Sequence, residues 1–123
     1  MLTLDNIISD RGSKYAVSGA PCMSESEAKA LLKTLKRQKK FAKATHNTWG
    51  VLLANAPIKN DDGESGAGMV ILRMLERAAL TNHLIIVTRW YGGKHLGCDR
   101  FRHVQDAVRQ YLDHIAHQAK ADP

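Results

Sequence analysis

The stretch from Leu84 to Gly97 constrains the fold of this chain more than any other. It opens with the apolar run Leu84-Ile85-Ile86-Val87, whose short length and β-branched residues predict a buried strand. The polar loop Arg89-Trp90-Tyr91-Gly92-Gly93-Lys94-His95-Leu96-Gly97 follows, and a helical pattern begins near Cys98. A strand, a glycine loop and a helix in this order predict a binding loop, because glycines allow close backbone approach and amides near a helix start favour anions.

Hydrophobic spacing and local signals predict the remaining elements. Ser24 and Glu27 have the form of a capping box, so a helix is expected to begin at Ser24. Strands are expected at residues 14–20 and 44–54, a short antiparallel return strand at 58–60, and further helices from Met69 and over residues 99–119.

This alternation predicts a two-layer α/β (α+β) sandwich, in which helices cover one face of a small mixed sheet of about four strands. A chain of 123 residues is long enough to bury a core of its own. We expect residues 1–123 to form a single domain, with residues 1–9 as a lead-in and 118–123 as a frayed tail.

The charge balance is basic, with 18 Lys and Arg against 12 Asp and Glu, which favours a polyanion or an acidic partner. Seven of the cations follow one another without an intervening acid: Lys29, Lys33, Lys36, Arg37, Lys39, Lys40 and Lys43. A solvated helix face explains this run, and a nucleic-acid face is the alternative. Phe41 is the one aromatic residue among them, so the run does not specifically indicate base stacking.

The cysteine count and the hydrophobic pattern point to an intracellular protein. Cys22 and Cys98 are too few for a disulfide framework, and no apolar run approaches the roughly 20 residues of a membrane span. We therefore expect a cytoplasmic chain without membrane contact.

A second unusual stretch is the acidic run Asp61-Asp62-Gly63-Glu64 and the small residues up to Gly68. Carboxylates so close together can bind a divalent cation or act as acid and base. They also precede a helix, where they satisfy amides and the helix dipole. The spacing is not that of an EF-hand, and no Gly-Lys-Ser/Thr follows the glycines, so we expect neither a metal nor a cofactor.

Some residues leave structural and functional interpretations open. Arg89 is expected to pair with Asp61, Asp62 or Glu64, and Trp90 and Tyr91 can simply cover the core. Among the six histidines, His95 is the one we would test for function. Cys98 at the start of the last helix meets part of the requirement for a reactive thiolate, which makes an enzyme an alternative.

Together the two unusual stretches resemble the signature of the IMPACT/YigZ family (UPF0029, Impact N-terminal domain). Other segments are similar to further family motifs: Arg11-Gly12-Ser13-Lys14-Tyr15, Ala44-Thr45-His46-Asn47 and Asp99-Arg100-Phe101-Arg102-His103. The resemblance covers about residues 10 to 115. Ser65, where the bacterial form has proline, and the pair Trp90-Tyr91 make the chain closer to the eukaryotic IMPACT branch.

The resemblance implies a fold like that of the second domain of a small-subunit ribosomal protein, with a left-handed β-α-β crossover. General rules favour a right-handed one. It also implies a regulator: IMPACT proteins compete for a ribosome-associated activator of the kinase that answers amino-acid starvation, and they bind actin. Bacterial relatives are linked to nucleic acid or ribosomes. The sequence shows neither the RWD domain of IMPACT nor the ferredoxin-like domain of YigZ, so we expect either a stand-alone member or an excised domain. Met1 and the short tail favour a stand-alone member.

We therefore expect a non-enzymatic binding domain that acts in translation control and the stress response through a ribosome-associated protein, and we leave its oligomeric state open. The first alternative is an RNA-binding protein that uses the face from Lys29 to Lys43, and the second is an enzyme that uses Cys98 or the acidic stretch. The predicted partner-binding surface consists of Asp61, Asp62, Glu64, Arg89, Trp90, Tyr91, Gly92, Gly93, Lys94, His95 and Arg100.

Overall fold

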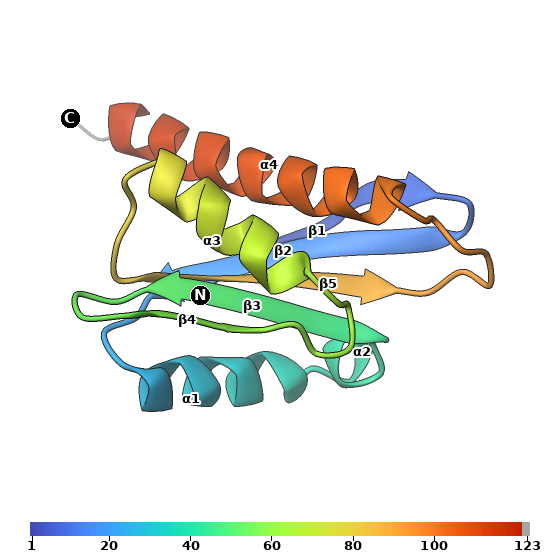
Figure 1. Cartoon of the computed structure of the whole chain (residues 1–123), viewed down its shortest axis with the longest axis horizontal. Helices are drawn as coiled ribbons and strands as arrows, with labels where there is room; N and C mark the ends of the chain where they lie inside the picture. The colour runs from blue at the N-terminus through green and yellow to red at the C-terminus, as the bar shows by residue number, and fades with distance from the viewer. Residues whose placement is uncertain (122–123) are drawn as a thin grey trace.

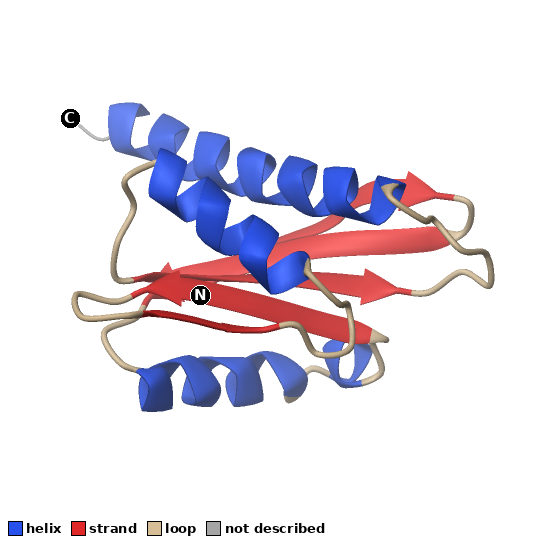
Figure 2. Ribbon diagram, in the orientation of Figure 1, coloured by secondary structure: helices blue, strands red, loops and turns tan. Residues whose placement is uncertain are grey.

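The computed structural model describes residues 1–121 and contains one sheet flanked by helices (Figure 1). In chain order the elements are β1 (Leu2–Asp10), β2 (Ser13–Pro21), α1 (Glu25–Lys36), α2 (Lys39–Ala42), β3 (His46–Leu52), β4 (Pro57–Asn60), α3 (Ala67–Arg77), β5 (His83–Trp90) and α4 (Asp99–Ala121). The strands lie in the order β1-β2-β5-β3-β4, and all neighbours are antiparallel (Figure 2). The α+β class is therefore confirmed, but the sheet is antiparallel and not mixed.

Both ends of the chain are more regular than the sequence indicates. The expected lead-in is the edge strand β1, which gives the sheet five strands instead of about four. Its pairing with β2 shifts between Leu4 and Ile8, where Asn6 has a φ of 51°. This irregularity interrupts the side-chain alternation by which a strand is recognised. At the other end α4 includes residues 118–121, which were expected to fray, and residues 122–123 lie outside the described part of the chain.

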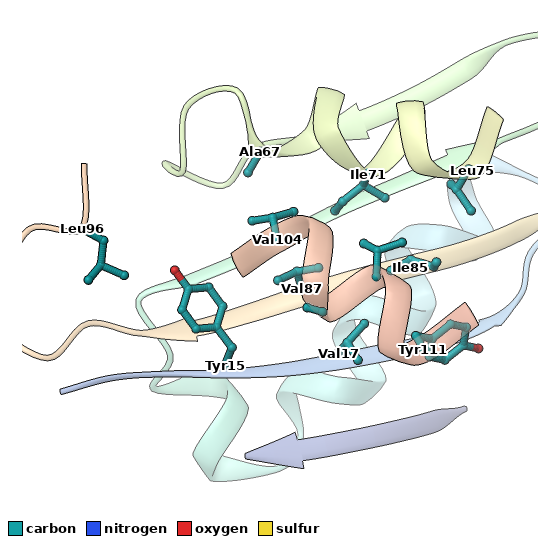
Figure 3. Packing of buried hydrophobic residues seen from close by; sticks show 12 residues of the cluster. Tyr15, Val17, Ala67, Ile71, Leu75, Ile85, Val87, Leu96, Val104 and Tyr111 are labelled. Atoms are coloured by element: carbon teal, nitrogen blue, oxygen red, sulfur yellow. The ribbon is translucent and has the colours of Figure 1, made fainter. Parts of the chain in front are cut away.

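Helices cover both faces of the sheet, so the expected arrangement with helices on one face is wrong (Figure 1). α3 and α4 pack on one face, in the cluster that contains Ile85 and Val87 (Figure 3). α1 and α2 pack on the other face, in the cluster that contains Leu84 and Ile86. The central strand β5 is thus buried on both faces, which explains its continuous apolar run. An amphipathic helix must bury its apolar stripe, but its sequence does not specify which sheet face it covers.

The topology contains the left-handed crossover that the family resemblance implies. β2 and β3 are parallel because both are antiparallel to β5 between them, and the connection through α1 joins them. β4 and β5 are likewise parallel on either side of β3, and α3 joins them. The two connections turn in the same sense within the plane of the sheet, yet they cross opposite faces. They therefore have opposite hands, and one is left-handed against the general preference.

Local signals in the sequence are confirmed where they depend on neighbouring residues. The Ser24 hydroxyl accepts a hydrogen bond from the Glu27 amide at 3.1 Å, which is the N-cap half of a capping box. The Glu27 carboxylate accepts one at 3.4 Å from the amide of Met23, one residue before the N-cap, and not from Ser24 itself. The short return strand exists as β4. Within residues 1–121 there is no helix with the length and apolar character needed to cross a membrane.

Candidate functional site

Arg89, Glu64 and His46 form a cluster at one end of the sheet, in which Arg89 and Glu64 are buried and His46 is half-buried. Arg89 lies on the central strand β5, opposite His46 of β3. Its Nη1 donates to Glu64 Oε1 at 2.8 Å, and His46 Nε2 lies 2.9 Å from Glu64 Oε2. Arg89 is 6% exposed and Glu64 is 3% exposed. The pairing of Arg89, which the sequence left open among three acids, is therefore confirmed for Glu64.

The cluster fixes the acidic loop, residues 61–66, against the sheet. Both carboxylate oxygens of Glu64 are engaged, and His46 Nδ1 lies 2.8 Å from the carbonyl oxygen of Asp62. A carbonyl oxygen only accepts, so Nδ1 carries a proton. Removing one member of a buried charge pair leaves the other uncompensated and costs about 3–5 kcal/mol. Glu64 and Arg89 therefore hold the acidic loop in place, and their buried side chains are not available for contact with a partner protein.

Asp61 and Asp62 bind backbone amides and take no part in the pairing with Arg89. Asp61 accepts hydrogen bonds from the amides of Gly66 and Gly68 at 3.1 and 2.8 Å and from Lys59 Nζ at 3.0 Å. Burial disfavours its charged form, but these hydrogen bonds outweigh burial and hold the pKa of Asp61 below its usual range. Asp62 accepts from the Asn47 amide at 2.7 Å. The contacts therefore support the helix-start interpretation for Asp61, whose amide partners lie at the start of α3, whereas Asp62 binds an amide of strand β3.

The glycine loop, residues 91–97, is tied to the turn before β2. The Ser13 hydroxyl accepts from Arg89 Nη2 at 3.3 Å and from the Gly92 amide at 3.2 Å. A Cβ added at Gly92 would lie 2.0 Å from the carbonyl carbon of Gly12, so a side chain does not fit there. At Gly93 a Cβ would meet nothing within 4 Å, but the φ of +90° favours glycine. The two adjacent glycines are thus needed for different reasons.

A cleft of about 570 Å³ lies between the acidic loop, the glycine loop and the start of α4. Glu64 and Arg89 line it together with Tyr91, His95 and Arg100. Tyr91 is 44% exposed, and the Arg89 guanidinium carbon lies 5.6 Å from the centre of its ring. The volume falls within the range of about 300–1,000 Å³ that is usual for small-molecule sites. These five predicted residues therefore come together around one cleft, whereas the lining does not include Lys94.

Trp90 does not share this surface. Its indole Nε1 donates to the Lys40 carbonyl oxygen at 3.0 Å, and its ring packs edge-on against Phe41 at 5.3 Å between centroids. Lys40 Nζ lies 5.2 Å from the centre of the same ring. Successive strand residues point to opposite faces, and β5 continues as far as Trp90, so Trp90 lies on the α1/α2 face. The predicted single surface is therefore divided between two faces of the sheet.

The sequence analysis did not select His46, Thr45 or Phe101 as site residues. His46 binds Glu64, and the Thr45 hydroxyl accepts from the Tyr91 amide at 2.9 Å. Phe101 lines the cleft, and its ring centre lies 4.7 Å from the guanidinium carbon of Arg100. The family resemblance could have indicated these residues. They belong to two segments that are similar to family motifs, Ala44-Thr45-His46-Asn47 and Asp99-Arg100-Phe101, and both segments flank the cleft.

The basic run of α1 and α2 is exposed along its length. Lys29 pairs with Glu25 at 3.8 Å, and Lys40 pairs with Asp5. Ion pairs within residues 1–121 do not involve the other five cations, which are Lys33, Lys36, Arg37, Lys39 and Lys43. This face is therefore a concentrated positive surface.

The two cysteines differ in exposure. Cys98 is exposed and lines the cleft, while Cys22 is buried. Burial raises the pKa of the Cys22 thiol. Over the described residues, no three His, Cys, Asp or Glu side chains are arranged to hold a metal ion.

Comparison with known proteins gives consistent matches. The family model of the Impact N-terminal domain matches residues 11–112. A protein IMPACT homolog of Caenorhabditis elegans is 35% identical over 114 residues, which cover 86% of this chain and 44% of that protein. Human protein IMPACT is 35% identical over 111 residues, which cover 85% of this chain and 35% of that protein. The chain thus spans less than half the length of these curated relatives.

Two solved structures are similar to the chain. One is the crystal structure of a hypothetical protein, with a TM-score of 0.79 over 90% of this chain and 57% of that one; at 21% identity it supports the fold alone. The other is the two-domain translational regulator Yih1, with a TM-score of 0.50 and 33% identity over 84% of this chain and 42% of that one. From the family match and these relatives, we conclude that the chain belongs to the Impact N-terminal domain family.

Proposed function

We propose that this chain is a non-enzymatic binding domain that acts in translation control through a ribosome-associated protein partner. Membership of the Impact N-terminal domain family supports a regulatory role, as does the similarity to Yih1, which is described as a translational regulator. The proposal rests on one observation: the glycine loop exposes aromatic and basic side chains, and the buried Glu64–Arg89 pair lies beneath it.

The contact residues of the proposed surface are Tyr91, Lys94, His95 and Arg100. The first three are exposed and Arg100 is half-buried, so all four are accessible. Tyr91, His95 and Arg100 line the cleft, and Lys94 lies on the same glycine loop. Tyrosine and arginine are enriched among the residues that dominate binding energy in protein interfaces. Glu64 and Arg89 act as positioning residues, because their buried pair determines where the loop leaves the sheet. In this division the acids support the loop, and the aromatic and cationic side chains contact the partner.

The test is capture of ribosome-associated proteins from a native lysate, with and without nuclease treatment. Tyr91→Ala and Lys94→Ala should each reduce capture, because each removes an exposed contact and leaves the buried Glu64–Arg89 pair in place. Lys120→Ala is the matched control and should leave capture unchanged, because Lys120 is exposed at the far end of α4 from the cleft and outside the basic α1/α2 face. Equal capture by Lys94→Ala, Tyr91→Ala and the parent chain, with unchanged circular dichroism, would contradict the proposed surface.

RNA binding by the α1/α2 face is the second candidate. The specific observation is the group of five exposed cations without ion pairs, defined above. Phosphate contacts of this kind make affinity fall steeply with salt, by roughly 0.7 powers of the salt concentration per contact for a single strand. A gel shift with Lys33→Ala, Lys36→Ala and Lys39→Ala combined should show weaker binding and a shallower salt slope. No shift with the parent chain at low salt would exclude this candidate.

A further inference from the structure

The cleft is positively charged in spite of the acidic loop beside it. Its charged lining residues other than histidine are Arg89, Arg100 and Glu64, so two cations face one carboxylate and these three side chains carry a net charge of +1. Both oxygens of Glu64 are already occupied, by Arg89 and His46. The carboxylates of Asp61 and Asp62 bind backbone amides and do not line the cleft. An anion that enters is therefore not repelled by a free carboxylate.

The wall formed by the glycine loop offers unused hydrogen-bond donors. The amides of residues 93–98 donate to no acceptor within residues 1–121, and residues 95–98 among them line the cleft. The amides of residues 99–101 instead close the first turn of α4 by bonding to the carbonyls of residues 96–98. Gly93 and Gly97 have positive φ values of 90° and 56°, a conformation in which consecutive amides can point to one side. The available donors thus belong to the loop and not to the helix.

Arg89, which lines the cleft, carries a further unsatisfied donor. Arg89 is 94% buried, being 6% exposed, and its Nε–H has no acceptor in the described part of the chain. A buried donor without a partner is uncommon in folded proteins, so Arg89 retains hydrogen-bonding capacity beside the cleft that the described residues do not satisfy. Arg100 also has no ion-pair partner within residues 1–121.

The walls of the cleft include two aromatic side chains, Tyr91 and Phe101. Tyr91 has 44% of its surface exposed, and its ring lies 6.0 Å from that of His95. Exposed aromatic faces bind flat heterocycles by stacking. We infer that the cleft binds a nucleoside phosphate, with the phosphate at the loop amides and Arg100 and the base against Tyr91 or Phe101. This goes beyond the proposed protein partner, and either can fail without the other.

A small ligand fits these observations better than a polynucleotide. Glu64 and Arg89 lie at the bottom of the cleft and are almost fully buried, so only a group that enters the cleft can approach them. The cations that a polynucleotide backbone would use are concentrated on α1 and α2, which pack on the opposite face of the sheet from α4. RNA binding is therefore an alternative to nucleoside phosphate binding, and the test distinguishes the two.

The test uses the full chain with four probes: AMP, adenosine, inorganic phosphate and a short single-stranded RNA without a terminal phosphate. Calorimetry measures affinity, and amide chemical shifts locate the site. Arg100→Gln is the test variant, and Arg102→Gln is its matched control, because Arg102 is exposed two residues further along α4 and pairs with Asp99 outside the cleft. Circular dichroism checks that both variants fold.

We expect saturable AMP binding, with the largest shifts at the amides of residues 95–98, which line the cleft. Adenosine and the Arg100→Gln variant should each show about tenfold weaker binding or more, as expected for a lost charge-assisted hydrogen bond. Arg102→Gln should stay close to the parent chain, and phosphate should shift the same amides at higher concentration. The inference is overturned by no saturable binding at millimolar AMP, by equal binding of adenosine, by shifts outside the cleft, or by RNA binding in preference to AMP.

Discussion

Two buried tyrosines give a stringent test of the structure. Tyr15 and Tyr111 are each 1% exposed, and burial raises the pKa of both to about 12 from an ordinary value of 10. They differ in one respect: the Tyr111 hydroxyl lies 2.6 Å from His83 Nε2, while the Tyr15 hydroxyl has no hydrogen-bond partner within residues 1–121. Tyr15 packs in the core beneath Leu96 of the glycine loop (Figure 3). Replacing each by phenylalanine therefore separates hydroxyl burial from hydrogen bonding.

At neutral pH the two substitutions should have opposite effects. Tyr15→Phe removes a buried hydroxyl whose desolvation is not offset, so the free energy of unfolding should stay the same or increase by about 1 kcal/mol. Tyr111→Phe leaves His83 without its partner and should lower the free energy of unfolding by about 1 kcal/mol. Urea unfolding followed by far-ultraviolet circular dichroism measures both.

In alkali the two substitutions should act alike. A tyrosine whose folded pKa lies above its unfolded value contributes its full stability below about pH 10 and loses it as the pH rises to about 12. Two pKa units at 1.36 kcal/mol each give a loss of about 2.7 kcal/mol per tyrosine over that window. Each phenylalanine variant should lack one such loss. A drop of more than about 1 kcal/mol for Tyr15→Phe at neutral pH would show that its hydroxyl is bonded and would refute the reasoning.

Three further outcomes test the site. Glu64→Ala should lower the free energy of unfolding, measured with urea, by about 3–5 kcal/mol, because Arg89 would remain buried without a counter-charge. Adding Arg89→Met should recover part of this loss, and no recovery would contradict the pairing. Gly92→Ala should lower the free energy of unfolding by about 3 kcal/mol or more, because the added Cβ would meet the backbone of Gly12. Gly93→Ala should lower it by about 1–2 kcal/mol, because only the positive φ disfavours alanine there. Equal losses for the two variants would be inconsistent with this packing. Iodoacetamide should label Cys98 in the folded chain and Cys22 only after unfolding, as mass spectrometry can measure, and labelling of both thiols at the same rate would contradict the burial of Cys22.

The sequence alone determined the features that depend on near neighbours. The capping box at Ser24 and Glu27 and the apolar run of β5 are recognisable because their contacts or spacing lie within a few residues. The face of Trp90 was also within reach of the sequence. Had the strand been extended from Val87 to Trp90, side-chain alternation would have placed Arg89 and Trp90 on opposite faces.

Only the tertiary structure decided how the two unusual stretches meet. Arg89 had three candidate acids, and the choice of Glu64 depends on a contact between residues 25 positions apart. The strand register brings His46 opposite Arg89, and the loop geometry turns Asp61 and Asp62 toward backbone amides. Local periodicity shows that a side chain will be buried, but register and loop path determine its partner. The sequence identified the segments that form the cleft, and the packing of β3 and β5 with the two loops made the buried support and the exposed rim.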